Sequence, residues 1–425
     1  MAIPTAPNAF IQLPDEFHFG ETVLLLPTQP IEHEAELEAK LEAKRTIAGA
    51  PNGEHIEDTD VVAVTSLDVL QRFNGTFGGF GFNTIFRPNS TKTPTPLPVT
   101  PDANDPTDNV LQLSLTSETM AFSKALGDVP NRGLDDQGDI ILNGISYLQT
   151  IIDTTLIEKT QPVLHFEPGL WMRVPESATM PNLAASFTRM GSIPHGTTIN
   201  AQCFNPAVTS KGPPVIPTAS ITPTTVSGNA PIPFPNQTFE KNDTHRLPQD
   251  LTPFNEAGTI TPAILQDPNT VLRNANAGKN IIENTTFTVS SQPENPQLGG
   301  GTSNIGFLTG ADGGVNTTSV PGRSGNANGA SVSAQYWISK VRAEVHLVPG
   351  QKTVSPASLG PRDAVPKFQV DIHVQEPRTV TVEYDQIQYS QHVALNFNAL
   401  SWPHVSVSTL APVINHKLSS VIVSQ

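Results

Sequence analysis

The sequence contains a single cysteine, Cys203, among its 425 residues. One cysteine cannot form an intramolecular disulfide, which excludes the disulfide-linked scaffolds of small secreted domains. It also excludes a structural zinc site built from several thiolates. The core of this chain must therefore be held by packing, without covalent or thiolate-metal cross-links.

Basic residues are also scarce, since 24 Lys and Arg stand against 39 Asp and Glu, for a formal net charge of -15. This balance disfavours nucleic acid as a partner, because phosphate binding needs a concentrated basic surface. No apolar run approaches the ~20 residues of a membrane-spanning helix. Residues 1–15 lack the basic and apolar segments of a signal peptide. The sequence predicts an acidic, soluble and cytoplasmic protein without a membrane span.

Signatures of nucleotide-binding proteins and hydrolases are missing as well. The glycine-rich segment Phe77–Gly81 lacks the Gly-Lys-Ser/Thr of a phosphate-binding loop, and no Gly-x-Ser-x-Gly occurs. No two histidines are spaced as His-x-His, which weakens the case for a metal site. No reaction follows from a motif.

Proline and glycine are abundant, with 40 and 30 residues, and they predict many turns and few long helices. Hydrophobic and polar side chains alternate with a period of two, for example in Val110–Thr116 and Val341–Leu347. Strands that are polar on one face are typical of antiparallel sheets. These strands carry few of the charges that protect exposed sheet edges, and closure of the sheet into a barrel removes such edges. The predicted fold is mainly β, an antiparallel β-barrel with a few short helices and long loops rich in Pro, Asn and Gly.

Shifts in composition divide the chain into four regions. Residues 1–59 are predicted to form an arm with a short charged helix at Glu32–Arg45. Residues 60–204 hold a first group of strands, and residues 205–284 form an insertion rich in Pro, Thr and Asn. Residues 285–425 hold a second strand group, which completes the barrel or forms a second β domain.

Three local patterns give sharper predictions. Thr261 as N-cap and Pro262 at the first helical position predict a short helix in the insertion. The segment Pro366–Val374 alternates cleanly and predicts a strand. Within Thr379–Phe397 the apolar positions change from even to odd near Asp385–Gln386, which predicts a tight turn or a bulge.

The segment His165–Pro175 carries the densest set of chemically useful side chains. In a single strand, His165, Glu167, Trp171 and Arg173 share one face. The His–Glu pair could transfer protons, with Glu167 orienting the imidazole, and Arg173 could pair with an anionic ligand group. The alternative is a structural strand with an internal Glu167–Arg173 ion pair.

Other histidines fall near predicted strand ends. The turn around His195 would place it at the mouth of a barrel, where it could bind iron or act as a base. His392 and Asn396 share one strand face, and His404 follows them. Facing inward, these residues would form a ligand site, with His392 and His404 as candidate metal ligands. Facing outward, they would form a solvated surface.

The segment Phe73–Phe82 resembles the first strand of lipocalin-like (calycin) barrels, which carries a Gly-x-Trp-x-Gly-x-Gly pattern. The matching positions are Gly75, Phe77, Gly79 and Gly81, with Phe77 in place of the tryptophan. The glycines suit a strongly coiled strand that needs positions without Cβ.

The strand at Phe166–Val174, with Glu167, Gly169 and Arg173, is similar to one in the nitrobindin-type heme-binding barrels of the same group. This resemblance implies a closed barrel with an apolar cavity and a hydrophobic ligand, in some members heme held by a histidine late in the chain. His392 and His404 are the late histidines beside aromatic residues. The chain is longer than such barrels, and its Pro-rich insertion has no counterpart in them.

The leading hypothesis is that the barrel cavity binds an apolar small molecule, either heme or a lipid-like metabolite. The candidate ligand contacts are Trp171, Met172, Arg173, Met190, His195, Trp337, His392, Asn396, Trp402 and His404. Two alternatives stay open. One is an enzyme that uses His165 and Glu167 as an acid–base pair. The other is a structural or assembly protein whose arm and insertion contact other subunits, as in a homo-oligomer.

Overall fold

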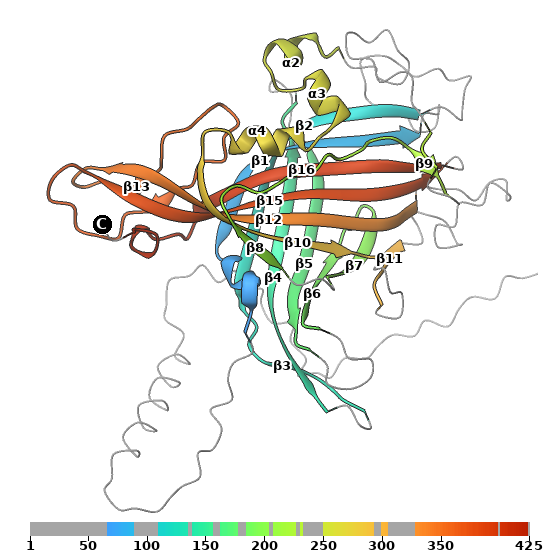
Figure 1. Ribbon diagram of the computed structural model, residues 1–425, viewed down its shortest axis with the longest axis horizontal. Helices are drawn as coiled ribbons and strands as arrows, with labels where there is room; N and C mark the ends of the chain where they lie inside the picture. The colour runs from blue at the N-terminus through green and yellow to red at the C-terminus, as the bar shows by residue number, and fades with distance from the viewer. Residues whose placement is uncertain are drawn as a thin grey trace, which may run out of the picture. The chain divides into compact units, whose positions relative to one another are not determined.

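A computed structural model of the chain describes residues 66–88, 109–134, 138–155, 162–176, 184–203, 207–226, 230–232, 250–292, 299–304, 328–397 and 400–423 (Figure 1). The predicted helix at Glu32–Arg45 lies outside these residues. None of the described helices is long and apolar enough to cross a bilayer.

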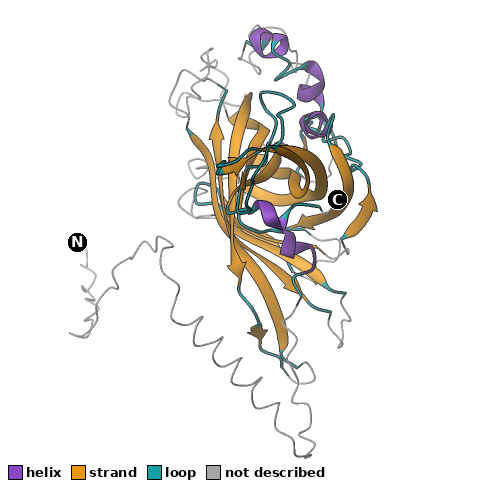
Figure 2. Ribbon diagram, turned by 90° about the vertical axis from the view of Figure 1, so that its left-hand side faces the viewer, coloured by secondary structure: helices purple, strands orange, loops and turns teal. Residues whose placement is uncertain are grey.

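Ten strands of the described chain close into an antiparallel β-barrel, as the sequence predicts (Figure 2). Each pairs with the next of the ten along the chain, and the last pairs with the first. The two halves meet where Ser290 pairs with Gln202. In ring order the strands are β1 (Thr76–Pro88), β2 (Asn109–Ala125), β4 (Ile140–Asp153), β5 (Val163–Val174), β6 (Ser186–Ser192), β7 (Thr197–Cys203), β10 (Asn280–Ser290), β12 (Asn328–Leu347), β15 (Arg378–Phe397) and β16 (Leu400–Ile414).

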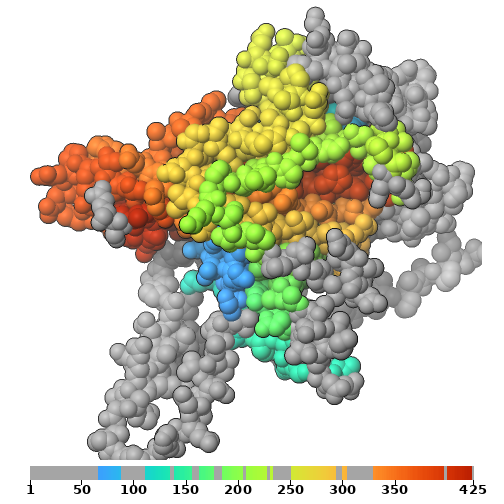
Figure 3. Space-filling view, in the orientation of Figure 1, coloured from blue at the N-terminus to red at the C-terminus, as the bar shows by residue number. Residues whose placement is uncertain are grey.

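Short strands add to the rim and outside of the barrel. They are β3 (Val129–Asn131) on β4, β8 (Val208–Lys211) on β10, β9 (Thr224–Thr225) on β16, β11 (Gly301–Asn304) on β7, and the separate pair β13 (Thr353–Val354) and β14 (Phe368–Gln369). The segment 207–226, which carries β8 and β9, therefore runs as a band across the outside of the barrel (Figure 3).

The glycines of β1 allow its close approach to β16. A Cβ atom on Gly79 would overlap the carbonyl oxygen of Thr409, and one on Gly81 would overlap that of Val407. Only residues without a side chain fit at these two positions, because the obstacle is neighbouring backbone that cannot swing away. This matches the reason given for the glycines from the sequence.

Three short helices cover one outer face of the barrel (Figure 1). They are α2 (Thr252–Glu256), α3 (Pro262–Gln266) and α4 (Thr270–Asn276). The helix predicted at Thr261 is confirmed as α3, because the Thr261 hydroxyl accepts a hydrogen bond from the Ile264 N–H. Ile264, Leu265 and Leu272 join outward-facing side chains of β1, β2 and β16 in one buried cluster.

The long strands β12 and β15 continue beyond the barrel as a hairpin (Figure 1). The predicted turn or bulge near Asp385–Gln386 is wrong, since β15 pairs with β12 through these residues without a register shift. The apolar face changes because the environment changes along the strand. Val382 and Tyr384 pack in the cluster of the hairpin, whereas Ile387 and Tyr389 face the barrel lumen.

The predicted strand at Pro366–Val374 is also wrong for most of its length. Only Phe368 and Gln369, as β14, are in a strand. The alternation itself is real, since Phe368 and Val374 are buried and Asp371 and His373 are exposed. The segment lies on the hairpin cluster without a continuous neighbouring strand, so burial alternates although the sheet hydrogen bonds are missing.

One end of the barrel lumen is filled by aromatic side chains. Phe73, Phe122 and Trp171 form part of a buried cluster in which the rings of Phe73 and Phe122 stack with centroids 4.8 Å apart. The 3-10 helix η1 (Asp68–Arg72) adds Val69 and Leu70 to the cluster. A second such helix, η3 (Leu418–Ser420), follows β16. The cluster leaves the other end of the lumen for polar side chains.

Candidate functional site in the barrel lumen

A buried ion pair lies in the middle of the lumen. Glu167 of β5 is fully buried, and Arg189 of β6 is 2% exposed. One guanidinium nitrogen of Arg189, Nη2, lies 2.8 and 2.9 Å from the two carboxylate oxygens of Glu167. Removing two charges from water costs several kcal/mol per ion, so a pair of this kind is a poor device for stability alone.

Three further side chains complete this group, which we call the Glu167 network. The Tyr147 hydroxyl donates to Glu167 Oε1 and accepts from Arg189 Nε at 3.0 Å. Arg189 Nη1 donates to Gln391 Oε1 at 2.6 Å. His165 Nε2 lies 3.0 Å from Glu167 Oε2. The network therefore connects β4, β5, β6 and β15 across the lumen.

The network fixes Glu167 as an anion. Burial alone would raise the pKa of Glu167, but Arg189, His165 and Tyr147 outweigh burial and lower it to about 2. Burial works against the Arg189 cation too, and the Glu167 carboxylate more than compensates, so the pKa of Arg189 is raised. Near neutral pH, Glu167 can orient a neighbour but cannot itself carry a proton.

Two glycines make room for the network. A Cβ on Gly169 would overlap the ring of Tyr147, which lies across β5. A Cβ on Gly191 would overlap Glu167 Oε1 and lie 2.9 Å from its Cδ atom. The obstacles are buried side chains held by hydrogen bonds, so they have little freedom to move away.

We expect Gly191→Ala to destabilise the barrel by about 1–3 kcal/mol, because the new methyl group must displace the Glu167 carboxylate from Arg189. Urea denaturation of the purified chain measures this. Gly196→Ala in the adjoining turn is the matched control, since its nearest neighbour would be an ordinary contact at 3.6 Å. Equal stability of the two variants would contradict the packing described for Gly191.

A second buried carboxyl group lies beside the network. Glu118 of β2 accepts hydrogen bonds from Tyr389 at 2.7 Å and from Gln149 Nε2 at 2.8 Å. Unlike Glu167, it forms no ion pair with an Arg or Lys side chain of the described residues. Burial accordingly raises the pKa of Glu118. Two carboxyl groups in one lumen thus have pKa values moved in opposite directions by their surroundings.

Histidines gather beyond the Glu167 network, at the end of the lumen away from the aromatic cluster. The rings of His165 and His195 meet edge to face with centroids 5.2 Å apart. His404 of β16 donates from Nε2 to Asn83 Oδ1 of β1 at 2.7 Å. We call His165, His195, His404 and Asn83 the histidine end. A small aliphatic cluster, made by Ile193, Ile199, Val332 and Val393, lies on the same part of the barrel wall.

The protonation state of His404 follows from its surroundings. Asn83 Oδ1 also accepts a hydrogen bond from the Ser406 hydroxyl at 2.7 Å, so this oxygen acts as an acceptor and His404 Nε2 carries the proton. Burial, followed by the nearby His165, His392 and His195, lowers the pKa of His404 to about 3. His404 is therefore a neutral imidazole whose unprotonated nitrogen is Nδ1.

The structure thus brings together four of the residues singled out in the sequence: His165, Glu167, His195 and His404. Trp171 lies in the aromatic cluster of the lumen, and Arg173 shares its strand face. Strand alternation places Met172, Met190, His392 and Asn396 on the outer face of the barrel, and His392 is exposed. Trp337 and Trp402 are buried in the cluster beneath the helices. His392 and His404 therefore point to opposite sides of the barrel wall.

Sequence reasoning missed Tyr147, Arg189 and Gln391, although a signal for one of them was present. Arg189 lies two residues after Phe187, so in a strand the two share one face, and the sequence places a charged residue beside a buried aromatic one. Such a residue predicts a buried partner of opposite charge. Which partner it finds depends on strand order, which the alternation does not contain.

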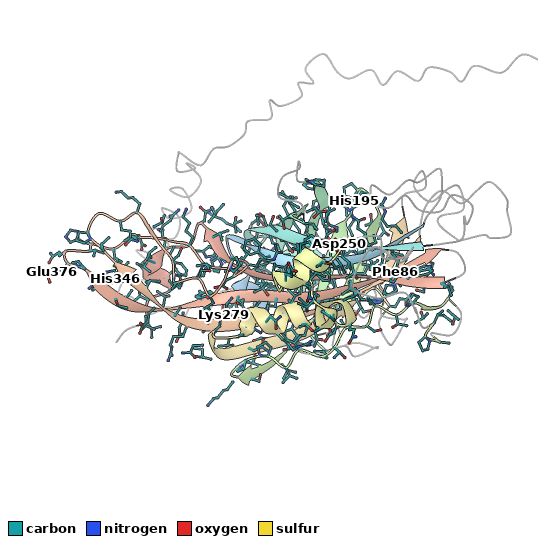
Figure 4. The ribbon with its side chains drawn as sticks, turned by 90° about the horizontal axis from the view of Figure 1, so that it is seen from above. Phe86, His195, Asp250, Lys279, His346 and Glu376 are labelled. Carbon is teal, nitrogen blue, oxygen red and sulfur yellow. The ribbon has the colours of Figure 1, made fainter. Side chains whose placement is uncertain are left out.

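Within the described ranges, no group of three or more His, Cys, Asp or Glu side chains could hold a metal ion. A pocket of about 450 Å³ lies outside the barrel, between the β12–β15 hairpin and the segment 356–366. Its wall includes Lys279, whose ammonium group lies 2.9 Å from Asp363. Figure 4 shows Lys279 and His195 in separate parts of the structure.

Comparison with protein-family models, with curated proteins and with solved structures gave no match to this chain. Its description therefore rests on its own geometry: a closed antiparallel barrel of ten strands with a charged network and a group of histidines in the lumen.

Proposed function

We propose that the barrel binds a small molecule at the histidine end of its lumen. The observation that supports this most is that the two ends of the lumen hold different kinds of side chain. Aromatic side chains pack one end solidly, whereas the other end presents imidazole groups next to aliphatic residues. Mostly apolar walls with a few fixed polar groups are typical of small-molecule sites.

Heme is one ligand class that these residues fit. The sequence resembles nitrobindin-type heme-binding barrels, and a histidine that serves as an axial ligand to heme iron must be neutral with an available nitrogen. His404 meets this condition, because burial lowers its pKa to about 3 and its proton lies on Nε2. The Asn83 hydrogen bond would orient the ring, as such partners do for metal-bound histidines. Bound heme would supply a redox-active iron. A lipid-like metabolite without iron is the other ligand class.

Titration of the purified full-length chain with hemin tests this proposal. We expect a shifted Soret band, and we expect His404→Ala to weaken binding by at least about tenfold, or about 1.4 kcal/mol. His392→Ala is the matched control, since His392 is an exposed residue on the outer face of the neighbouring strand.

A parallel titration with a fluorescent apolar probe, read through Trp fluorescence, covers the metabolite class. Probe binding without a Soret shift would favour an apolar metabolite over heme. Absence of both signals would contradict small-molecule binding.

A further inference from the structure

We infer that the histidine end also transfers protons, with His165 as a general base toward the bound molecule. Glu167, Arg189 and Tyr147 are then positioning residues that act through His165. The inference rests on the proposed binding function and names its substrate class: a small, largely apolar molecule with a weakly acidic O–H or C–H group. The wall of the histidine end would bind the apolar part of that molecule.

The Glu167 network determines which nitrogen of His165 carries the proton. Both Glu167 oxygens act as acceptors, because Arg189 Nη2 donates to each of them and the Tyr147 hydroxyl donates to Oε1. The Nε2 atom of His165 must therefore donate to Oε2 across their 3.0 Å separation. In neutral His165 the unprotonated nitrogen is then Nδ1, which has no hydrogen-bond partner among the described residues.

His165 is placed between the buried network and solvent. Its side chain retains 13% of its surface exposed, whereas Glu167 retains none. The exposed His195 lies against it edge to face. A base for a bound molecule needs this intermediate position, because it must contact the ligand and still exchange protons with water.

The contact between the anionic Glu167 and His165 goes beyond what packing and charge balance require. Arg189 and Tyr147 already satisfy the carboxylate, so the His165 contact is additional. When Nδ1 takes a proton from the O–H or C–H group, the bond's electron pair stays on the substrate. The imidazolium that forms is stabilised by Glu167, which keeps its charge. Return of the proton to another atom isomerises the substrate, and no oxidant or reductant is needed.

A chromogenic phenol, 4-nitrophenol, tests this step directly. At about pH 7 imidazole is largely unprotonated and much of the free phenol still carries its proton, so transfer of that proton to His165 shows as new phenolate absorbance on binding. We expect wild-type protein and His392→Ala to produce this absorbance. We expect His165→Ala to lose it, and Tyr147→Phe, which keeps the ion pair, to reduce it in part.

A second measurement needs no bound molecule. Diethyl pyrocarbonate acylates unprotonated imidazole, and peptide mass spectrometry gives the rate for each histidine. We expect His165 to react several-fold faster in wild-type protein than in Glu167→Gln, because the carboxylate holds the His165 proton on Nε2 and leaves Nδ1 as the nucleophile. The rate at the exposed His346 should be the same in both proteins, and circular dichroism checks that Glu167→Gln keeps a folded barrel. Figure 4 shows His346 on the hairpin, well away from His195.

The outcomes separate this inference from the proposed binding function. If hemin or the apolar probe binds but 4-nitrophenol gives no phenolate signal, or the same signal in His165→Ala, proton transfer is overturned and binding stands. If His165 reacts equally fast in wild-type protein and in Glu167→Gln, the assigned role of Glu167 is overturned as well. If no ligand binds at all, the binding function fails first.

Discussion

Replacing Arg189 with methionine is expected to destabilise the barrel by about 3–5 kcal/mol, because it leaves the buried Glu167 carboxylate without its cation. Methionine fills much of the same volume, so loss of packing contributes little. The pKa of Glu167 would also rise, since Arg189 would no longer oppose the effect of burial on the carboxylate. Urea denaturation at about pH 7 measures the loss.

The double variant Glu167→Gln with Arg189→Met is the decisive control. It removes both charges and leaves polar groups for Tyr147 and His165, so we expect it to be clearly more stable than Arg189→Met alone. Additive effects of the two substitutions would show that the two side chains do not interact. That result would contradict the Glu167 network.

Acid is expected to unfold this protein in two stages. Above about pH 6.5, His404 is neutral in both the folded and the unfolded chain, so it does not affect stability. Between about pH 6.5 and pH 3, the imidazole of His404 is protonated in the unfolded chain but stays neutral in the folded chain. At 1.36 kcal/mol per pKa unit, this difference in proton binding lowers the free energy of unfolding by at most about 5 kcal/mol.

The second stage belongs to Glu167. Its folded pKa of about 2 lies below the ordinary value of 4.5, so its stabilising effect is complete above that value and is lost as the pH falls toward 2. Glu118 acts in the opposite direction, because its pKa is raised in the folded state.

The free energy of unfolding measured from pH 8 to pH 4 tests the first stage. His404→Gln should flatten the decline between about pH 6.5 and 4.5, since glutamine does not titrate. His346→Gln is the control, because His346 is exposed on the hairpin. An unchanged slope in His404→Gln would contradict the burial of His404 as a neutral imidazole.

Several features could be read from the sequence because they depend on neighbouring residues. The alternation in Val110–Thr116 gave the two faces of β2, although its leucine face packs beneath the helices outside the lumen, and Thr261 with Pro262 gave the start of α3. Even the failed strand at Pro366–Val374 shows the same rule, since its buried positions were right. Burial alternates with the local backbone, whereas a strand also needs a partner from elsewhere in the chain.

The buried face of a single strand can also change along its length. In β15, Val382 packs in the hairpin and Ile387 faces the lumen, and the strand between them is continuous. The sequence pattern suggested a break in the backbone, because alternation records which side is buried and not what buries it.

By itself, the sequence determined the antiparallel β-barrel class and the division of each strand into two faces, through a period of two that the strands carry locally. Only the tertiary structure decided that Tyr147, Glu167, Arg189 and Gln391 meet, and that His404 joins His165 while His392 faces outward. Those contacts depend on strand order and register across four or more strands, and each register is set by pairings between residues far apart in the chain.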